Sequence, residues 1–208
     1  MRKIRLFTGE FYHVYNRGAD KRAIFLDRAD YLRFKLGLKE FNTRKRIFHL
    51  KHPVATRLRQ EDELVDICCY CLLPNHFHLV LKQEQPEGIS SFMQKVGTGY
   101  AQYFNKRYMR TGVLFQGPFK AKHVESDAHM LELSRYVHLN PWGLAEGHKR
   151  EAKERYLVSY PWSSFKSYAQ RSHKDGLIGA QEIILGQFGF NRSLYKDFVL
   201  QSDTSKPS

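Results

Sequence analysis

Two histidines separated by a single residue are the strongest chemical feature of this sequence. They lie in the run Leu73-Pro74-Asn75-His76-Phe77-His78-Leu79-Val80-Leu81, which predicts a turn followed by a strand. Alternate residues of a strand point to the same face, so the imidazoles of His76 and His78 leave the sheet side by side. Two neutral imidazoles at this spacing can hold one divalent cation and leave room for a carboxamide, water or phosphate oxygen. A histidine pair of this kind can equally be packed or hydrogen-bonded on a half-buried sheet. A second group of residues is needed to distinguish a metal-binding pair from a structural one.

That second group lies on a later helix, which the pattern places from residue 126 to 140. Tyr136 and Asn140 are four residues apart and therefore stack on one face of this helix, about a turn from each other. Leu133 and Val137 lie further around the cylinder and can dock the helix against the sheet. A tyrosine hydroxyl and a carboxamide oxygen then project together, as a nucleophile and a hard oxygen ligand. Taken alone, the two residues are equally well explained as a packed tyrosine and a helix-ending asparagine.

The elements that position these residues follow from hydrophobic periodicity and from capping signals. The predicted strands span 11–17, closed by Gly18, then 64–73 and 76–82, with extended pieces at 113–116 and 119–124. The predicted helices run from 28 to 43 behind an Asp27 N-cap, from Ser90 or Ser91 to about Lys106, and from 126 to 140. The order strand-helix-strand-strand-helix-strand-helix is typical of an α+β fold of the ferredoxin-like split βαβ type, with an antiparallel sheet.

The two groups together resemble the single-tyrosine HUH transposases, and most closely their REP-associated branch. The resemblance covers roughly residues 10–170 in order. Its further matching pieces are Tyr12-His13-Val14-Tyr15-Asn16-Arg17-Gly18, Ile24-Phe25-Leu26-Asp27, Gly112-Val113-Leu114-Phe115-Gln116 and Tyr160-Pro161-Trp162-Ser163-Ser164. Some relatives carry Gln where this chain has Asn140, and Met is common at the position of Leu73.

The resemblance implies a fold, a cofactor and a reaction. The fold is that of the HUH endonucleases, and the cofactor is a divalent ion, Mg²⁺ or Mn²⁺, held by His76, His78 and Asn140. Tyr136 is the implied nucleophile of a metal-dependent endonuclease and strand transferase that forms a 5′-phosphotyrosine on single-stranded DNA beside a hairpin. A phenol needs a nearby divalent ion or base, because it is a poor nucleophile at neutral pH unless a cation or base favours the phenolate. The implied location is the bacterial cytoplasm, and both monomeric and homodimeric relatives exist.

Three segments follow from this reading of the chain. Residues 1–170 are expected to form the HUH domain, with a basic insertion at about 44–62 that is longer than the family leads us to expect. Residues 171–200 are expected to form a helical C-terminal extension, with candidate helices at 181–190 and 193–200. Residues 201–208 read as a disordered tail.

The charge balance predicts a polyanionic partner. Lysine and arginine number 34 against 21 acidic residues, which gives a net charge of +13. Nucleic acid is the first candidate and an acidic membrane surface the second. The 12 tyrosines and 15 phenylalanines, many beside cations, suit stacking on unpaired bases. The candidate phosphate contacts share only their charge and position: Arg17, Arg44, Lys45, Arg46, Lys51, Arg57, Arg59, Lys120, Lys122 and Arg135.

Cysteine content and hydropathy argue for a reducing, non-membrane setting. No apolar run approaches the roughly 20 residues of a membrane span, and the basic start is not followed by an apolar stretch. Three cysteines, Cys68, Cys69 and Cys71, do not suit a disulfide framework. Cys69 and Cys71 share a strand face and could lie across from His78, which would permit a Cys2His2 zinc site. Buried strand cysteines are the favoured alternative.

The sequence is also compatible with two other functions. The first is a hairpin-binding protein that does not cleave, which would need the basic surface but none of His76, His78, Tyr136 and Asn140. The second is a metal-dependent hydrolase of RNA or DNA in which water attacks and Tyr136 is structural. A covalent protein–DNA adduct separates the transposase-type nuclease from both.

Overall fold

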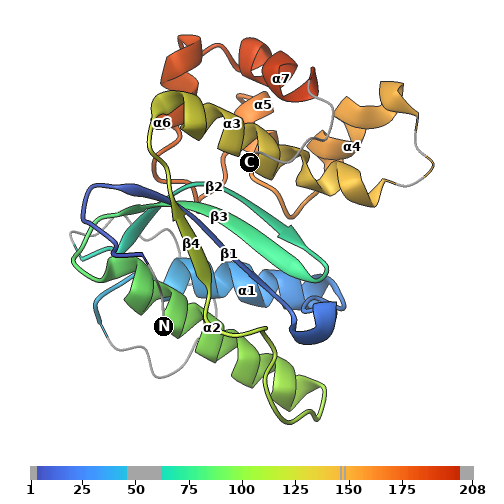
Figure 1. Cartoon of the computed structure of the whole chain (residues 1–208). Coiled ribbons are helices and arrows are strands. Elements are labelled where there is room, and N and C mark those ends of the chain that lie inside the picture. Colours follow the sequence, from blue (N-terminus) through green and yellow to red (C-terminus); the bar gives the residue numbers. More distant parts are fainter. Residues whose placement is uncertain (1–3, 46–61, 146, 148, 202–208) are drawn as a thin grey trace.

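A four-stranded antiparallel sheet carries helices on both faces (Figure 1). The computed structural model describes residues 4–45, 62–145, 147 and 149–201. The elements in chain order are β1 (Phe11–Arg17), η1 (Ala19–Lys21), α1 (Arg28–Glu40), β2 (Val65–Leu73), β3 (His76–Gln83), α2 (Gly88–Arg107), β4 (Lys120–His123), α3 (Asp127–Leu139), η2 (Asn140–Leu144), η3 (Arg150–Ala152), α4 (Lys153–Ser159), α5 (Phe165–Ala169), α6 (Glu182–Leu185), η4 (Gly186–Phe188) and α7 (Arg192–Leu200).

The strand order is β2-β3-β1-β4, and every pair of neighbours is antiparallel. This order, with α1 and α2 as the connections, is the ferredoxin-like split βαβ arrangement that the sequence pattern predicts. The register places Tyr15 of β1 and Cys71 of β2 on either side of His78 in β3. The α+β prediction is therefore confirmed.

Helices α1 and α2 cover one face of the sheet (Figure 1). The core between these two helices and the sheet is apolar and closely packed, with Tyr12, Phe34, Leu79 and Phe92 fully buried. Helix α1 begins where the sequence predicts, because the Asp27 carboxylate accepts hydrogen bonds from the backbone at the first turn. Burial of these large side chains is the main source of stability on this side of the sheet.

Helix α3 and the C-terminal helices cover the opposite face (Figure 1). Leu133 and Val137 of α3 are buried in a second apolar cluster, as their spacing predicts. A bulge in β2 at Cys68 shifts the register, so that Cys68 joins Cys69 on this face. Helices α5 to α7 pack against α3 in the same cluster, which confirms that the chain beyond residue 170 is helical at 182–188 and 192–200.

Helix α2 starts earlier than the sequence suggests. Neither Ser90 nor Ser91 is the N-cap, because the helix already begins at Gly88. The side chain of Gln83, at the end of β3, accepts a hydrogen bond of 3.1 Å from the backbone N–H of Ile89. The helix N-terminus is thus satisfied by a residue of the preceding strand, and no serine is needed there.

Two further boundaries differ from expectation. Helix α1 ends at Glu40 instead of residue 43, because the Asn42 side chain binds the start of β2: it donates to the Val65 carbonyl and accepts from two backbone N–H groups there. Residues 113–116 form no strand, and only Phe115 makes an isolated bridge, to Gly18.

The outer edge of β2 is covered by backbone from the C-terminal third of the chain. The N–H of Leu72 donates to the Trp162 carbonyl, and the N–H of Gly179 donates to the Ile67 carbonyl. The ring of Trp162 stacks on Tyr31 of α1 with centroids 4.4 Å apart. The Tyr160-Pro161-Trp162-Ser163-Ser164 motif therefore closes this edge of the sheet.

Candidate active site

The turn in front of the two histidines is held by the segment that joins β1 to α1. The backbone N–H of Gly18 donates to the Asn75 carbonyl, and the N–H groups of Ile24 and Phe25 both donate to the Pro74 carbonyl. A Cβ at Gly18 would lie 2.2 Å from the Arg22 carbonyl oxygen, so this close approach needs glycine. The start of β3 is consequently fixed from outside its own hairpin.

His76 and His78 point to the same face of the sheet, as their spacing predicts. Their ring centroids are 5.1 Å apart and the rings are nearly perpendicular. The intervening Phe77 is buried in the opposite core, against Phe34 of α1. The strand therefore presents both imidazoles to α3.

His76 is oriented by a chain of contacts that begins in the η1 turn. Asp20 and Lys21 adopt left-handed backbone conformations, with φ of 53° and 59°. The Lys21 carbonyl accepts from the side-chain N–H of Asn75 at 3.1 Å, which leaves the Asn75 carboxamide oxygen 2.6 Å from Nδ1 of His76. A carboxamide oxygen can only accept, so His76 carries its proton on Nδ1 and a lone pair on Nε2.

His78 is buried and has one unpartnered nitrogen. Its Nδ1 lies 2.8 Å from Nε2 of His13 on β1, whereas its buried Nε2 has no hydrogen-bond partner among the residues that the structure describes. Burial lowers the pKa of His78 well below its usual value, and the neighbouring His13 and His76 lower it further. Burial, together with Arg17, also lowers the pKa of His76 to about 4. Both imidazoles are therefore neutral at pH 7, as metal ligands must be.

Tyr136 stands over this pair from α3. Its ring meets the ring of His78 edge to face at 5.3 Å between centroids and that of His13 at 6.2 Å. Asn140 follows the last residue of α3, and its side-chain N–H donates to the Tyr136 carbonyl at 2.8 Å. The structure thus brings Tyr136 against His78 within one chain and ties Asn140 to the same turn of helix.

The helix that carries Tyr136 is fastened by buried polar contacts to the C-terminal helices. His138 is fully buried, with Nδ1 2.6 Å from the Tyr195 hydroxyl and Nε2 2.7 Å from the Ser164 hydroxyl. The Tyr195 hydroxyl also donates to the Ser134 hydroxyl at 3.1 Å. Burial lowers the pKa of His138 to about 3, so it is a neutral hydrogen-bonding group. Helix α7 therefore helps to set the position of the tyrosine.

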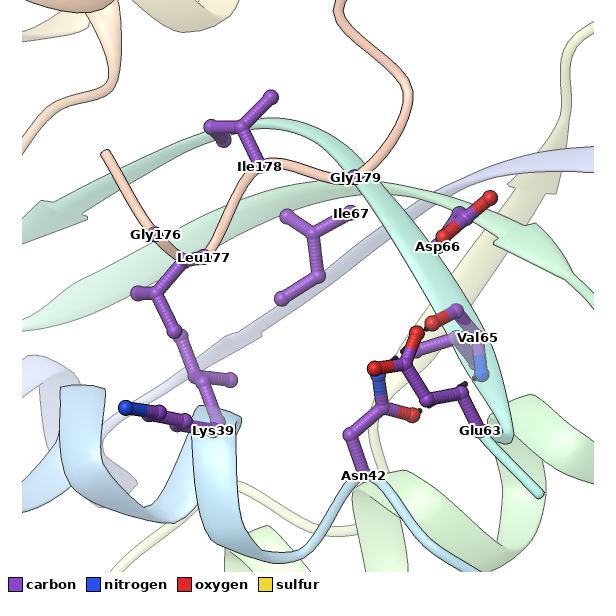
Figure 2. Close-up of a pocket in the computed structure, with 11 residues that line it drawn as sticks. Lys39, Asn42, Glu63, Val65, Asp66, Ile67, Gly176, Leu177, Ile178 and Gly179 are labelled. Carbon is purple, nitrogen blue, oxygen red and sulfur yellow. Dashed lines mark hydrogen bonds between the residues drawn. The ribbon is translucent and has the colours of Figure 1, made fainter. Parts of the chain in front are cut away.

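A large open cavity lies between α3 and the β1–β4 side of the sheet, directly beside Tyr136. Its volume is about 1040 Å³, and its lining includes His13, Tyr15, His78, Lys122, Glu132 and Tyr136. A smaller hollow of about 290 Å³ lies near the start of β2 (Figure 2), lined among others by Lys39, Asn42 and Asp66. None of the predicted catalytic or metal-binding residues lines this smaller hollow, so the cavity beside Tyr136 is the candidate active site.

Three of the predicted phosphate contacts share a sheet face with the histidines. Arg17 pairs in register with His76, and Lys120 and Lys122 of β4 pair with residues of β1 that face α3. Lys120 and Lys122 are exposed. These three side chains give the rim of the candidate site a positive charge.

The remaining phosphate candidates lie elsewhere. Arg135 is paired with Glu132 and sits over the ring of Phe198 at 4.6 Å, which turns its charge toward α7. Arg44 and Lys45 follow α1 and adjoin the start of β2, at the far end of the β2–β3 hairpin from His76. Arg46, Lys51, Arg57 and Arg59 lie outside the described residues, as does most of the expected 44–62 insertion.

The three cysteines are buried strand residues, which is the alternative that the sequence favours over a zinc site. Cys71 does lie across from His78, yet Cys68, Cys69 and Cys71 are all free and buried, and burial raises the pKa of each thiol. Within the described ranges, no group of three or more His, Cys, Asp or Glu side chains is placed to hold a metal ion. The structure therefore favours buried strand cysteines over the Cys2His2 zinc alternative.

The donor set is nevertheless compatible with a hard divalent ion. The Asn75 contact leaves Nε2 of His76 for another partner, Nε2 of His78 is buried and unpartnered, and the Asn140 carboxamide is bound to the Tyr136 carbonyl. Two imidazoles and a carboxamide leave positions for phosphate and water oxygens, which Mg²⁺ and Mn²⁺ accept readily.

Sequence reasoning did not identify His13 or Asn75 as members of the site. The alternation in β1 shows that His13 and Tyr15 share a face, but only the pairing of β1 with β3 brings that face beside His78. Asn75 precedes His76 directly and reads as a turn residue. Its second role, orienting His76, depends on the Lys21 carbonyl more than fifty positions away along the chain.

Comparison with known proteins agrees with this geometry. The family profile described as "Transposase IS200 like" matches residues 40–140, a range that contains His76, His78, Tyr136 and Asn140. Over these residues the chain is similar to the IS200-like transposases. A solved structure of a REP-associated tyrosine transposase bound to a REP hairpin has the same fold, with a TM-score of 0.57 over 86% of this chain and 92% of that chain. No curated protein sequence matches the chain.

The similarity to the IS200-like transposases supports a coarse role. The identity to the solved transposase is 14%, so that likeness concerns the fold. The family match over residues 40–140 supports a transposase-type role on DNA. Across the described ranges, no helix has the length and apolar character to cross a membrane.

Proposed function

We propose that this chain is a metal-dependent endonuclease and strand transferase that cuts single-stranded DNA beside a hairpin and holds the cut end on Tyr136. The observation that carries the proposal is the approach of the Tyr136 ring to His78, whose buried Nε2 lacks a protein partner. A hairpin-binding protein needs neither a tyrosine nor an unsatisfied imidazole nitrogen at this place.

His76, His78 and Asn140 are the residues that would hold the divalent ion. When bound there, Mg²⁺ or Mn²⁺ would polarise a non-bridging phosphate oxygen and favour the phenolate form of the tyrosine. The chain's own contribution begins with charge: Arg17, Lys120 and Lys122 neutralise phosphates along the strand as it enters the cavity. The cavity beside Tyr136 is wide enough to take unpaired nucleotides.

The reaction that we propose is an in-line displacement at phosphorus. The Tyr136 oxygen attacks, the bond from phosphorus to the 3′ oxygen breaks, and a 5′-phosphotyrosine forms. The proton that the phenol loses is balanced by the proton that the departing oxygen gains as it becomes a 3′-hydroxyl. A second 3′-hydroxyl can later attack the phosphotyrosine, which rejoins DNA and restores the phenol without ATP.

Single-stranded substrate suits this arrangement better than duplex. An unpaired strand can bend so that its phosphate reaches Tyr136 beside the cavity, and aromatic side chains such as Tyr15 offer a surface for its bases. By analogy with the solved relative, we propose that a hairpin flanks the cleavage site and places the strand. A single chain contains both halves of the site, so a monomer suffices in this proposal.

The test is formation of a denaturation-resistant protein–DNA adduct on a labelled hairpin substrate with Mg²⁺ or Mn²⁺. We expect Tyr136→Phe to lower adduct formation by about 10³-fold or more and to leave hairpin affinity nearly unchanged, because one oxygen is lost and the ring remains. Tyr103→Phe on α2, a matched loss of a hydroxyl remote from the histidines, should form adduct at the wild-type rate.

The competing functions give different results in the same assay. Cleavage without an adduct, unaffected by Tyr136→Phe, would identify a hydrolase in which water attacks. Tight hairpin binding with neither cleavage nor adduct would identify a non-cleaving hairpin-binding protein.

A further inference from the structure

The contact between His13 and His78 constrains the protonation of both rings. His78 Nδ1 and His13 Nε2 are 2.8 Å apart, both residues are buried, and the rings stack with centroids 5.1 Å apart. At this separation the two nitrogens share one proton. Either His13 donates to His78 or His78 donates to His13.

The two arrangements differ at the other nitrogen of His78. If His13 donates, a neutral His78 carries its proton on Nε2, and a buried N–H then points into the site with no acceptor among the described residues. If His78 donates, Nε2 carries a lone pair that a cation can satisfy. An unsatisfied buried donor costs free energy, so the second arrangement is favoured in the metal-free protein, and a bound cation stabilises it further.

We propose that His13 is a positioning residue that accepts the Nδ1 proton of His78 and thereby directs the Nε2 lone pair of His78 toward the divalent ion. The inference rests on the proposed function, because the ion is the one assigned there to His76, His78 and Asn140. His13 is thus assigned no contact with the ion or with DNA.

His76 shows the same arrangement, and its partner Asn75 allows only one position for the ring proton. The Asn75 oxygen accepts from Nδ1 of His76, so His76 already presents Nε2 to the site. His13 performs for His78 what Asn75 performs for His76. Outer partners of this kind fix ring orientation and raise ligand basicity.

The surroundings of His13 keep its ring in place. It lies on the central strand β1, in register with Val80 of β3 and Lys122 of β4. Its ring packs against Tyr15 at 4.8 Å and meets the edge of Tyr136 at 6.2 Å. Being held on both sides, it can define the direction of the His78 ring.

The test measures metal binding directly, by titrating the DNA-free protein with Mn²⁺ and following free Mn²⁺ by electron paramagnetic resonance. We expect His13→Leu, which cannot accept a proton, to weaken Mn²⁺ affinity by about 10- to 100-fold. His13→Gln retains an accepting oxygen and should recover part of that loss. His173→Gln removes an exposed imidazole outside the site and should bind Mn²⁺ as the wild type does.

A second readout reports the proton itself. In metal-free protein with ¹⁵N-labelled histidine, long-range ¹H–¹⁵N spectra should show His78 as the Nδ1–H tautomer in the wild type and in His13→Gln. In His13→Leu the same resonance should shift toward a mixture with the Nε2–H form. Circular dichroism identifies folded variants, and the Gln variant keeps the test decisive if the Leu variant does not fold.

Three results would overturn the inference. Unchanged Mn²⁺ affinity in both His13 variants would remove the positioning role. A wild-type His78 with its proton on Nε2 would reverse the hydrogen bond. An affinity loss in both His13 variants as large as that of His78→Ala would make His13 a ligand. A wild-type protein that fails to bind Mn²⁺ would instead contradict the proposed function.

Discussion

The two faces of β3 are built from alternate residues of one strand, yet they differ in almost every property. Phe77, Leu79 and Leu81 point toward α1 and α2 and are buried in an apolar core. His76 and His78 point toward α3, where apolar packing shares the face with imidazoles, a tyrosine and a cavity. The α1–α2 face has the character of a folding core and the α3 face that of a binding site.

The difference shows how a small domain can keep an unsatisfied polar atom in its interior. A buried nitrogen without a partner costs about 1–3 kcal/mol. Packing of Phe77 and its neighbours stabilises β3 from the other side, so the strand can keep His78 Nε2 without a partner among the described protein groups. This nitrogen lies on the face to which the proposed function assigns the metal ion.

Alanine substitutions at two neighbouring positions of β3 should give the largest difference between the two faces. Phe77→Ala should lower the free energy of unfolding by about 3–5 kcal/mol, because it empties a large volume in a closed core. His78→Ala should cost no more than about 1–2 kcal/mol of stability, yet it should reduce adduct formation about 10³-fold by removing a proposed metal ligand. Urea unfolding and the adduct assay measure the two effects. Equal losses of stability would mean that the two faces do not divide in this way.

Two buried tyrosine hydroxyls, one on each face, sharpen the comparison. Tyr195→Phe should lower stability by about 1–3 kcal/mol and slow adduct formation about tenfold, because His138 and Ser134 lose the partner that positions α3. Tyr100→Phe removes a hydroxyl that donates to the Ile24 carbonyl beneath the other face. It should lower stability by a similar amount and leave the rate per folded molecule unchanged. A rate loss in the Tyr100 variant would couple the α1–α2 face to the chemistry.

Acid should lower the free energy of unfolding through the buried histidines of the α3 face, and the contribution of His138 can be measured separately. Its pKa is about 3 in the fold, because of burial, against about 6.5 in the unfolded chain. Above pH 6.5 both states are neutral and the linkage vanishes. Between pH 6.5 and 3 only the unfolded state binds the proton, so stability falls with falling pH by up to about 1.4 kcal/mol per unit.

Replacing this histidine with a neutral side chain should remove that dependence. His138→Gln should be less stable than the wild type at pH 7 but should lose less stability between pH 6.5 and 5, as followed by urea unfolding. The groups packed around the ring are Tyr168, Tyr195 and Ser164, which stay neutral over this range. An identical pH slope in wild type and variant would assign the acid sensitivity to other histidines.

The smallest predicted effect of a substitution is on the salt dependence of hairpin affinity, through the charged rim of the candidate site. With about six phosphate contacts, hairpin affinity should fall about 10³-fold between 50 and 200 mM salt. Lys120→Gln with Lys122→Gln should lower the slope of log affinity against log salt by about 2. Arg28→Gln with Lys39→Gln, on α1 beneath the other face, should leave the slope unchanged. Equal effects of the two pairs would mean that DNA does not distinguish the faces.

Local patterns were sufficient to predict the element order and which of the candidate side chains share a face. Alternation places His76 and His78 on one face, and the four-residue spacing keeps Tyr136 and Asn140 on one turn of helix. The structure then brings Tyr136 against His78, a contact between distant parts of the chain that only the family resemblance could suggest. Capping chemistry likewise predicted the starts of α1 and α3.

Contacts that depend on register or on side chains from other elements could not be predicted. The cap of α2 comes from Gln83, a strand residue that carries no helix signal. His13 reaches His78 only through the pairing of β1 with β3. Arg135 has the charge and position of a DNA contact, yet Glu132 and Phe198 occupy its guanidinium. Composition indicates that such a charge exists and says nothing about where it points.

The outer strands of the sheet have a consequence for self-association. An exposed strand edge is a template on which another chain can add a strand. Along β2 the backbone at Ile67, Tyr70 and Leu72 is already engaged by residues 162–164 and 179. On the other side β4 has only four residues, and two of them are lysines. Both borders therefore discourage the strand-by-strand stacking that leads to fibrils, even though the sheet is rich in β-branched and aromatic residues.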